Sequence, residues 1–578
     1  MESLIYVDTD VVCLLSQLNA YDYIIVGSGF GGGSLAEVLA LQKKRVLLVE
    51  RGDVIFSTHI LNTSRPYFGR GASNNPEGNE SVFDSVKAKV QCTEGSESFI
   101  GGPIYCLGGR SNVWGIWTPQ ISQDTLVEYF PYEIKQSLLD KGGYKKAFDF
   151  ITSKSQTDFV YPMGSGAENN PVRISEAELQ DTQCLLQAAV PEAGPSGGFT
   201  LMPVAAEFNS SAPYKFPQGA YSTTLALMNR MFANDKYLTV LMRTEVLAVQ
   251  RSSDENGSAG RGSSITSLKV RNTKDGTIRD LGVGSAKVIL AAGSIGTASI
   301  ALNSGLHQLP APASGLVGKG IIDHDICYVR FAMEKGLELK KPLNLKSVVT
   351  IDGRRCLLTV TVNANFFLAG SSASTAPAQW YRDGRLIKSP RSRAAPGDTT
   401  EYDTIAVLFE FVGPLEDKNE VLSLPGKDPV LHIIRPAIKP QVQAGMEDIT
   451  RQIRNRFVYN DENFKTDDPP PRPVRMGFGV FAHECGTMRM DGPKGQGVVD
   501  TDLKVKGLDN LWVCDLSVFP VSPEANPGLT LAALSLRLAQ HLEGKPLDDL
   551  EPWCQETATR SLDSDLTVCS CAKGGRKS

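Results

Sequence analysis

The sequence predicts an α/β protein with two domains, and three observations lead to that prediction. A strand–turn–helix–strand pattern runs from YDYIIVG through SGFGGG and an Ala/Leu-rich stretch to RVLLVERG, over residues 21–52. Alternating apolar residues, typical of strands, recur between residues 330 and 470, as in VTIDGRRCLLTVTV and TIAVLFEFVG. Residues 510–542 predict a strand, a loop and a Leu-rich helix. We therefore expect a Rossmann-like domain assembled from discontinuous segments, with a β-sheet domain inserted into it.

Shorter patterns divide the chain further. The segments YLTVLMRTEVLAVQ and ITSLKVRNT flank a polar loop and predict a hairpin-like pair, and KVILAAG predicts a buried strand. The polar end of the chain, which includes a C-x-C at Cys569 and Cys571, is expected to be a disordered and functionally silent tail. We assign residues 1–20 to an N-terminal extension, 21–150, 235–330 and 475–545 to the nucleotide-binding domain, 151–234 and 331–474 to the substrate domain, and 546–578 to the tail.

Composition excludes several classes of function. The chain has 578 residues, a net charge of −5 and a pI near 5.9, which does not favour contact with nucleic acid. No uninterrupted run of about 18 apolar residues is present, so we predict no membrane span. The eleven cysteines have no framework spacing, and the first twenty residues lack a basic segment typical of a secretion signal. We therefore predict a cytoplasmic protein with mostly reduced thiols.

A glycine pattern, G-x-G-x-x-G, stands at Gly27, Gly29 and Gly32 between the first strand and the helix. Gly27 is expected to make the turn, Gly29 to let the backbone approach a pyrophosphate, and Gly32 to let the helix pack on the strand. The helix N-terminus offers free N–H groups to phosphates, and Glu50 can accept from ribose hydroxyls. A turn that binds nothing is the alternative. The flanking strand and helix favour a dinucleotide, which this pattern alone leaves as NAD or FAD.

Stretches from both ends of the chain together resemble the glucose-methanol-choline (GMC) family of flavin oxidoreductases. In chain order they are YDYIIVGSGFGGGSLAEVLA through LLVERG, LGGRSNVWG, TEVLAV, VILAAGSIGTASIALNSG, GKGIIDHD, HECGTMRM and NPGLT. LGGRSNVWG is most similar to the branch that contains pyranose oxidases. Residues 330–470 match no family motif, which is usual for the substrate domain of this family.

The resemblance implies FAD as the cofactor. In pyranose oxidases a histidine just before the tryptophan tethers the flavin, but Val113 holds that position here, so we predict FAD bound without a covalent bond. The helix that begins at Pro527 would aim its N-terminus at the flavin ring and stabilise negative charge there. The cofactor-binding residues implied by the resemblance are Gly27, Ser28, Gly29, Phe30, Gly32, Glu50, Arg51, Gly109, Ser111, Asn112, Val246, Ala292, Gly293, Asp515, Pro527 and Thr530. We predict no metal site.

Two residues of the C-terminal motifs are candidates for catalysis. Oxidation of an alcohol requires removal of the hydroxyl proton, and histidine is the usual base near neutral pH. The resemblance gives this role to His483 and the holding of the hydroxyl oxygen to Asn526. A buried structural histidine and a helix cap are the alternatives for these two positions. Among the remaining five histidines, His324 matches a structural motif of the family, while His59, His307, His432 and His541 have no supporting context.

One departure from the family pattern lies next to the candidate base. Glu484 follows His483, where many relatives carry proline. This residue adds a charge to the loop or alters its path, and the sequence leaves its role open.

The function that we predict is oxidation of a CH–OH group of a small or cyclic alcohol, by hydride transfer to flavin N5. A sugar or a specialised metabolite fits this prediction, with oxygen or another compound as the final electron acceptor. Two alternatives are a lyase of the same fold that needs FAD only structurally, and a non-catalytic flavin-binding protein. The sequence leaves the substrate and the oligomeric state open.

Overall fold

The computed structural model describes residues 6–60, 83, 85–152, 176–193, 198–205, 220–252, 263–332, 343–362, 380–382, 385–387, 404–457 and 472–544. The C-x-C pair at residues 569 and 571 and the predicted tail lie outside these ranges. None of the described helices is long and apolar enough to cross a membrane.

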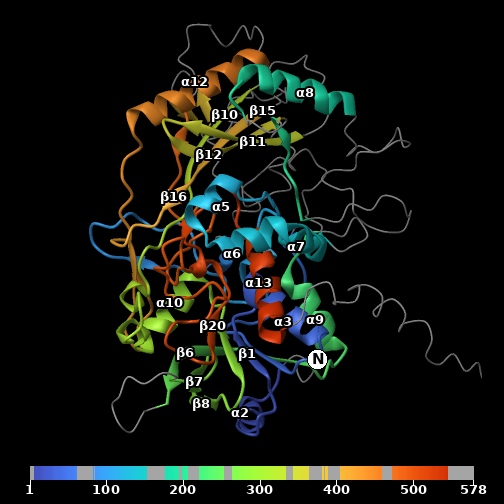
Figure 1. The fold of residues 1–578 in the computed structure, drawn as a ribbon, viewed down its shortest axis with the longest axis vertical. Coiled ribbons are helices and arrows are strands. Elements are labelled where there is room, and N and C mark those ends of the chain that lie inside the picture. The colour runs from blue at the N-terminus through green and yellow to red at the C-terminus, as the bar shows by residue number, and fades with distance from the viewer. Residues whose placement is uncertain are drawn as a thin grey trace, which may run out of the picture.

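A five-stranded parallel sheet forms the centre of the lower half of the molecule (Figure 1). Each strand pairs in parallel with its neighbours, and β1 and β2 are buried along their whole length. Apolar residues fill these strands because both faces of the sheet are covered. The strands come from widely separated parts of the chain, in the order β20 (Leu511–Val513), β9 (Lys287–Leu290), β1 (Tyr23–Val26), β2 (Val46–Val49) and β5 (Leu238–Leu241).

Helices cover this sheet and bring the two ends of the chain together. Helix α3 (Phe30–Leu41) packs against both α13 (Gly528–Glu543) and α9 (Thr223–Phe232). Helix α9 falls within the residues that we assigned to the substrate domain, yet it lies with the parallel sheet because its buried face, which includes Leu227, contacts α3 and β5. Helices α5 (Gln123–Tyr129), α6 (Tyr132–Lys135) and α7 (Gly143–Thr152) follow α3 in the chain, and α7 packs on α13.

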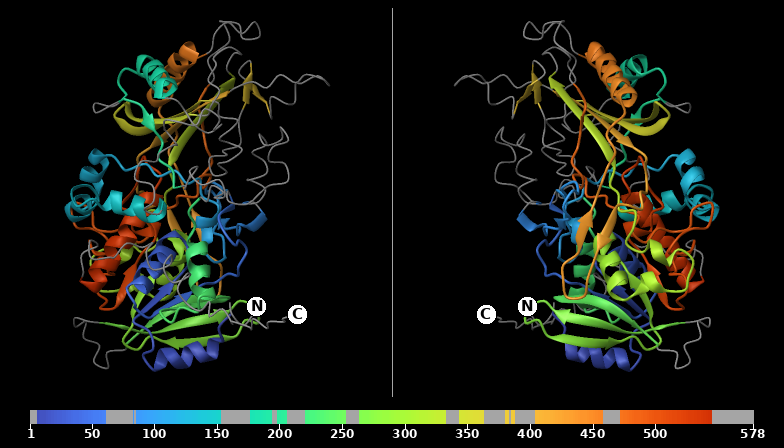
Figure 2. Two further views of the ribbon diagram at one scale, coloured as in Figure 1. Left: turned by 90° about the vertical axis from the view of Figure 1, so that its right-hand side faces the viewer. Right: turned by 90° about the vertical axis from the view of Figure 1, so that its left-hand side faces the viewer.

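The predicted hairpin is present, but it uses only part of the expected segments. Strands β6 (Thr244–Arg251) and β7 (Ile265–Asn272) pair antiparallel, and β8 (Ile278–Gly282) completes a three-stranded sheet. The preceding YLTVLM belongs instead to β5 of the parallel sheet, because Arg243, with a φ of 55°, turns the chain between them. The predicted N-terminal extension contains helix α2 (Thr9–Gln17), which lies against β8 (Figure 2).

The upper half is built on a second, larger sheet of eight strands (Figure 1). Its outer face carries α8 (Glu176–Ala189) and α12 (Pro440–Phe457), which share a separate apolar core with the sheet. Its inner face, through Tyr328, Leu357 and Leu408, joins the main core of the molecule. The strands are β4 (Thr200–Leu201), β10 (Asp325–Ala332), β11 (Leu343–Ile351), β12 (Arg354–Val362), β13 (Trp380–Arg382), β14 (Arg385–Ile387), β15 (Thr404–Phe411) and β19 (Val474–Arg475).

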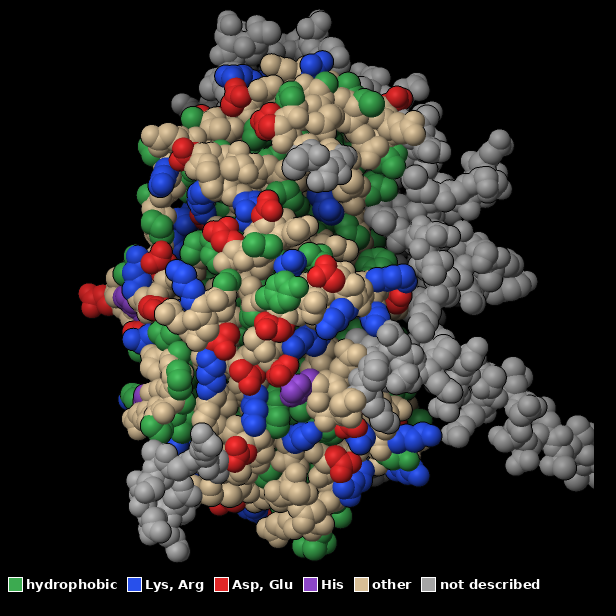
Figure 3. Space-filling view, viewed as in Figure 1, with side chains coloured by type: hydrophobic (Ala, Val, Ile, Leu, Met, Phe, Trp, Pro, Cys, Tyr) green, Lys and Arg blue, Asp and Glu red, His purple; other side chains and the backbone are tan. Residues whose placement is uncertain are grey.

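Two small sheets and one helix connect the halves. Strand β16 (Gly413–Pro414) pairs with β21 (Val521–Ser522), and β18 (Val430–His432) lies between β17 (Glu420–Leu422) and β3 (Gln91–Cys92). Helix α10 (Gly293–Asn303) packs on β6 and β17. The fold is therefore the expected α/β arrangement of a discontinuous nucleotide-binding half and a β-sheet half. On the face shown in Figure 3, the acidic and basic side chains of the described residues are interspersed.

Helix α3 carries a carboxyl group in an unfavourable place. Burial raises the pKa of Glu37 to about 7, while Arg230 opposes that shift. The folded protein therefore holds the proton more tightly than the unfolded chain, and ionised Glu37 destabilises the fold at higher pH.

We predict that Glu37→Gln raises the stability at pH 8 by on the order of 2 kcal/mol, and that this gain disappears as the pH falls from 7 to about 4.5. Denaturant unfolding at pH 8 and pH 5 measures the difference. Glu133→Gln, which removes an exposed carboxylate on α6, is the control. An equal effect of Glu37→Gln at both pH values would contradict the prediction.

Candidate active site

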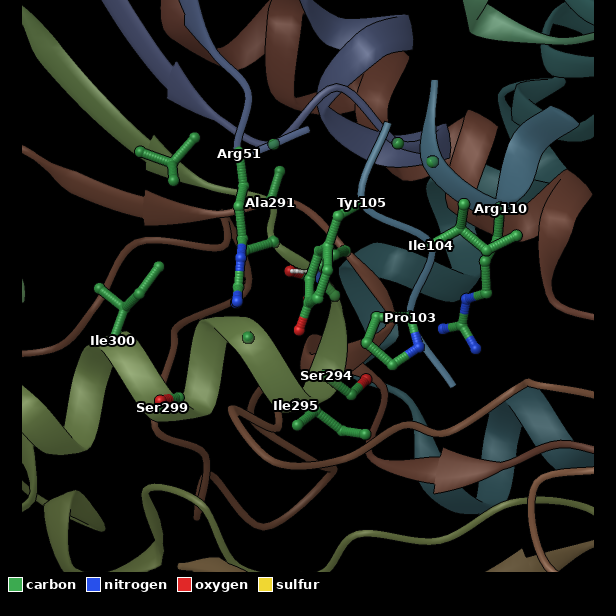
Figure 4. A pocket seen from close by; sticks show the side chains of 18 of the residues that line it. Arg51, Pro103, Ile104, Tyr105, Arg110, Ala291, Ser294, Ile295, Ser299 and Ile300 are labelled. Carbon is green, nitrogen blue, oxygen red and sulfur yellow. Dashed lines mark hydrogen bonds between the residues drawn. The ribbon is translucent and has the colours of Figure 1, made fainter. Parts of the chain in front are cut away.

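A cavity of about 760 Å³ runs between the glycine turn and the C-terminal motifs. Its volume lies in the range of cofactor pockets. Gly27 and Glu50 line one part of it, and His483 and Asn526 line another. Helix α10 passes along the cavity with Ser294, Ile295, Ser299 and Ile300, as Figure 4 shows.

Each of the three motif positions requires glycine for a different geometric reason. Gly27 has a φ of 102°, and a Cβ atom there would lie 2.3 Å from the carbonyl oxygen of Ala291. A Cβ atom at Gly32 would lie 2.1 Å from the carbonyl oxygen of Gly27, so the helix could not approach the turn. A Cβ atom at Gly29 would meet nothing within 4 Å, because that side of Gly29 faces the cavity. This is the arrangement that a pyrophosphate requires.

Two helices begin at the cavity. Helix α3 starts directly after Gly29, and α10 starts at Gly293, which also lines the cavity and has a φ of 78°. Neither helix has a side-chain cap or an acidic residue in its first turn. Their N-terminal N–H groups and dipoles therefore favour an anionic group between them.

Two buried carboxylates hold this end of the cavity together. Glu50 accepts hydrogen bonds from the backbone N–H and the hydroxyl of Ser28, at 3.0 and 2.5 Å, and from the N–H of Gly52 at 2.8 Å. Asp515 accepts from the N–H groups of Gly293 and Ser517, each at 2.9 Å, and from the hydroxyl of Thr297. Burial raises the pKa of each carboxyl group, and these hydrogen bonds oppose that rise. Each oxygen can accept a further bond, so both residues can also bind a ligand.

A cluster of charged and aromatic residues lines the cavity near β2 and β6. The guanidinium of Arg51 lies 2.9 Å from the carboxylate of Glu245 and 3.9 Å from the centre of the Tyr105 ring. Arg271 also pairs with Glu245. Val246, the residue predicted for the adenine side, lines the same region. Figure 4 shows Arg51 and Tyr105 extending into the cavity.

His483 and Asn526 lie at the other part of the cavity, where helix α13 begins. The Nδ1 atom of His483 and the Oδ1 atom of Asn526 have no hydrogen-bond partner among the described residues. Asn526 is 7% exposed and stands two residues before α13. Burial, the neighbouring His324 and Arg110 hold the pKa of His483 well below its ordinary value. His483 is therefore neutral near pH 7 and able to accept a proton.

A second histidine and two carboxylates surround His483. The ring of His324 meets the ring of His483 edge to face, with centroids 4.8 Å apart, and burial lowers the pKa of His324 to about 3. Burial and Glu484 raise the pKa of Asp323 to about 7. Donor atoms of Asp323, His324 and His483 lie within 4.8 Å of one another, a spacing at which a metal ion could be held. That no metal binds stays a prediction.

Glu484, the residue after His483, forms an ion pair. Its Oε2 atom accepts from Nη1 of Arg110 at 2.6 Å, and both residues line the cavity. The added charge beside His483 therefore has a partner of opposite sign.

The comparisons with known proteins agree with this geometry. Residues 440–535 match the model of the GMC oxidoreductase C-terminal domain. An oxygen-dependent choline dehydrogenase of Brucella anthropi is 23% identical over 92% of this chain and 98% of its own length. A long-chain-alcohol oxidase of Arabidopsis thaliana is 22% identical over 91% of this chain and 68% of its own length. The chain is thus similar to GMC oxidoreductases over most of its length, and its residues 440–535 match the family model.

These similarities confirm the predicted class of enzyme, a flavoprotein oxidoreductase that acts on alcohols. A solved structure supports the fold: the crystal structure of pyridoxine 4-oxidase from Mesorbium loti has a TM-score of 0.54, with 16% identity over 91% of this chain and all of that chain. The resemblance of LGGRSNVWG to the pyranose-oxidase branch rests on that motif alone and stays a prediction.

Most of the residues predicted from the GMC motifs line the cavity, and three do not. Gly32 packs behind the turn, as expected. The amide nitrogen of Asn112 donates to the carbonyl oxygens of Leu107 and Gly109, so this side chain holds its own loop. The hydroxyl of Thr530 lies 3.2 Å from that of Tyr144. The residues that line the cavity as predicted are Gly27, Ser28, Gly29, Phe30, Glu50, Arg51, Gly109, Ser111, Val246, Ala292, Gly293, His483, Asp515, Asn526 and Pro527.

Several cavity residues were missed from the sequence. Glu245 lies inside the quoted TEVLAV but received no role, and Tyr105 and Arg271 lie outside the quoted family motifs. Only the fold brings these three residues to the part of the cavity that Arg51 lines. Arg110 lies inside the quoted LGGRSNVWG but received no role.

The glycine geometry separates cofactor binding from folding. Gly29 has a φ of −60° and open space beside it, so Gly29→Ala keeps the fold, but its methyl group occupies the cavity. We predict at least a tenfold weaker affinity for FAD, with an unchanged melting temperature of the apoprotein. Gly32→Ala is the matched variant, and because its methyl group meets backbone atoms, we expect loss of folded protein. Flavin-fluorescence titration and thermal unfolding measure the two effects, and tight FAD binding by Gly29→Ala would contradict this reading of the cavity.

Proposed function

We propose that this chain oxidises a small or cyclic alcohol with FAD bound non-covalently in the cavity, and that His483 is the base. The observation that carries the proposal is the continuity of the cavity. It joins the glycine turn, the two helix N-termini and Glu50 to His483 and Asn526. A cofactor held by the first group would therefore extend to the second.

The residues of the cavity fit this cofactor. Gly29 leaves space for the pyrophosphate, and the N-termini of α3 and α10 complement its charge. His483 is the one histidine that lines the cavity in the described part of the chain, and no cysteine lines it there. Val113 lies instead in a small apolar cluster with Ile60, Ile104 and Cys106. These features support a flavin without a covalent bond to Val113 or its neighbours.

Bound FAD would supply the hydride acceptor. Neutral His483 accepts the hydroxyl proton through a ring nitrogen, and the amide of Asn526 forms a hydrogen bond with the hydroxyl oxygen. The N-terminus of α13, directly after Asn526 and Pro527, places positive partial charge at this end of the cavity. The ring of His324 limits the orientations open to the imidazole of His483.

The relatives support an alcohol as substrate without selecting one. Their names give choline, long-chain alcohols and pyridoxine, which differ in charge and size. We therefore propose the reaction class for this chain, with oxygen or another compound as the electron acceptor. A substrate panel for this protein includes these alcohols as well as sugars.

The role of His483 has a direct test. We predict that His483→Ala binds FAD with normal stoichiometry but reduces the flavin with alcohol at least a thousandfold more slowly, because no base remains. Anaerobic stopped-flow absorbance measures this rate. His541→Ala on helix α13, outside the cavity, is the control. A rate for His483→Ala near that of the control would remove His483 from the mechanism.

The low pKa of His483 sets the pH dependence. The neutral imidazole is the active form, so activity is present above this pKa and is lost as the pH falls through it. We predict that kcat/KM stays level from pH 8 through pH 6.5 and declines only at lower pH. Initial rates across this range provide the measurement, and a decline centred at or above 6.5 would contradict the environment described for His483.

A further inference from the structure

Arg110 and Glu484 join two motifs of the cavity that are far apart in the sequence. Arg110 lies in the short helix η3 (Gly109–Asn112), and Glu484 follows His483. Their side chains meet at 2.6 Å, and both line the cavity.

The two side chains of this pair differ in their exposure. The side chain of Glu484 is 1% exposed, whereas that of Arg110 is 25% exposed. Both residues line the cavity, and Arg110, which Figure 4 labels, is the more exposed member of the pair. A guanidinium remains protonated at any working pH, so this charge is permanent.

The loop that carries Glu484 is held firmly. Its backbone oxygen accepts from the hydroxyl of Ser294 at 2.5 Å, and Cys485 donates its N–H to Ile322 at 2.8 Å. The carboxylate of Glu484 is thus held in place, and through the ion pair it also holds the guanidinium of Arg110 in place.

The part of the cavity lined by His483 and Asn526 is called the reaction end here. Among the Lys and Arg residues of the described cavity lining, Arg110 is the one that contacts a neighbour of His483. Arg51 and Arg271 pair with Glu245 on strand β6. Arg110 instead pairs with the neighbour of His483 and acts electrostatically on both His483 and Asp323. The remaining cations of the lining are Lys269 and Lys427.

We propose that Arg110 stabilises the negative charge that develops at the reaction end of the cavity, and that Glu484 positions Arg110 and offsets part of its charge. This inference rests on the proposed function. In the oxidation of an alcohol to a carbonyl compound, His483 would take the hydroxyl proton, and bound FAD would supply the acceptor for the hydride and its two electrons. That transfer would add one negative charge to the cofactor, which the fixed cation of Arg110 would stabilise.

The midpoint potential of the bound flavin tests this proposal without any substrate. Arg110→Gln removes the cation, so the potential shifts to a more negative value. Glu484→Gln leaves the cation and removes the offsetting charge, so the potential shifts to a more positive value. Each shift corresponds to a change on the order of tenfold in the equilibrium for reduction by a reference dye, since charges in a cavity are poorly screened.

Three further variants make the test specific. Arg110→Lys keeps the charge and restores most of the potential, which a purely structural role would not predict. The double variant Arg110→Gln/Glu484→Gln removes both charges, so its potential lies between those of the two single variants. The control is Arg230→Gln, which breaks the ion pair between Arg230 on helix α9 and Asp235, just after that helix. Neither residue lines the cavity, so this variant leaves the potential unchanged.

The outcomes distinguish this inference from the proposed function. A wild-type protein that binds no flavin would overturn the proposed function itself. Bound flavin with the same potential in wild type and Glu484→Gln, or shifts of the same sign in Glu484→Gln and Arg110→Gln, would overturn the role of the pair. If Arg110→Gln does not fold, the sign of the shift in Glu484→Gln and the potential of Arg110→Lys decide the matter.

Discussion

The contact between the turn after β1 and the end of β9 is the constraint on which the rest of the site depends. The N–H of Ala291 donates to Val26 at 2.8 Å, and the N–H of Gly27 donates to Val49 at 2.8 Å. These bonds bring Gly27 so close to the carbonyl of Ala291 that no side chain fits there. Because the strands are parallel, the helices that follow β1 and β9 both begin at this edge. The anion-binding geometry is thus a consequence of sheet order.

The part of the cavity lined by His483 and Asn526 depends on a different constraint. There, two buried histidines stay neutral. His483 and His324 contact each other in a place where a charged imidazole is unfavourable. The ion pair of Arg110 and Glu484 also lines the cavity, and its cation is the more exposed member. A neutral base beside a fixed positive charge suits a reaction in which a proton is removed and negative charge accumulates.

Local patterns in the sequence were sufficient for the fold class and for much of the candidate site. The glycine turn could be predicted because its roles depend on backbone geometry within a single βαβ unit. His483 and Asn526 could be proposed because the GMC motifs fix their places. Motif membership was less informative for Asn112 and Thr530, whose side chains bind Leu107, Gly109 and Tyr144 instead of lining the cavity.

What the sequence could not supply were contacts between distant segments. Tyr105 reaches Arg51 only because residues 103–105 line the cavity, and Glu245 and Arg271 meet only in the β6–β7 hairpin. Glu484 had no visible partner in the sequence, since Arg110 lies 374 residues away. The packing of α9 against α3, which moves part of the predicted substrate segment to the other half, has the same origin.

The central claim is that one cavity holds a flavin against a base, and an anaerobic visible spectrum of the purified protein tests it most directly. The spectrum is recorded before and after addition of the alcohols named above, together with sugars and cyclic alcohols. This account predicts a two-banded flavin spectrum that bleaches with at least one of these alcohols and returns on admission of an electron acceptor. A protein that binds no flavin, or a flavin that never bleaches while the substrate is turned over, would contradict it, and the second result would identify a lyase.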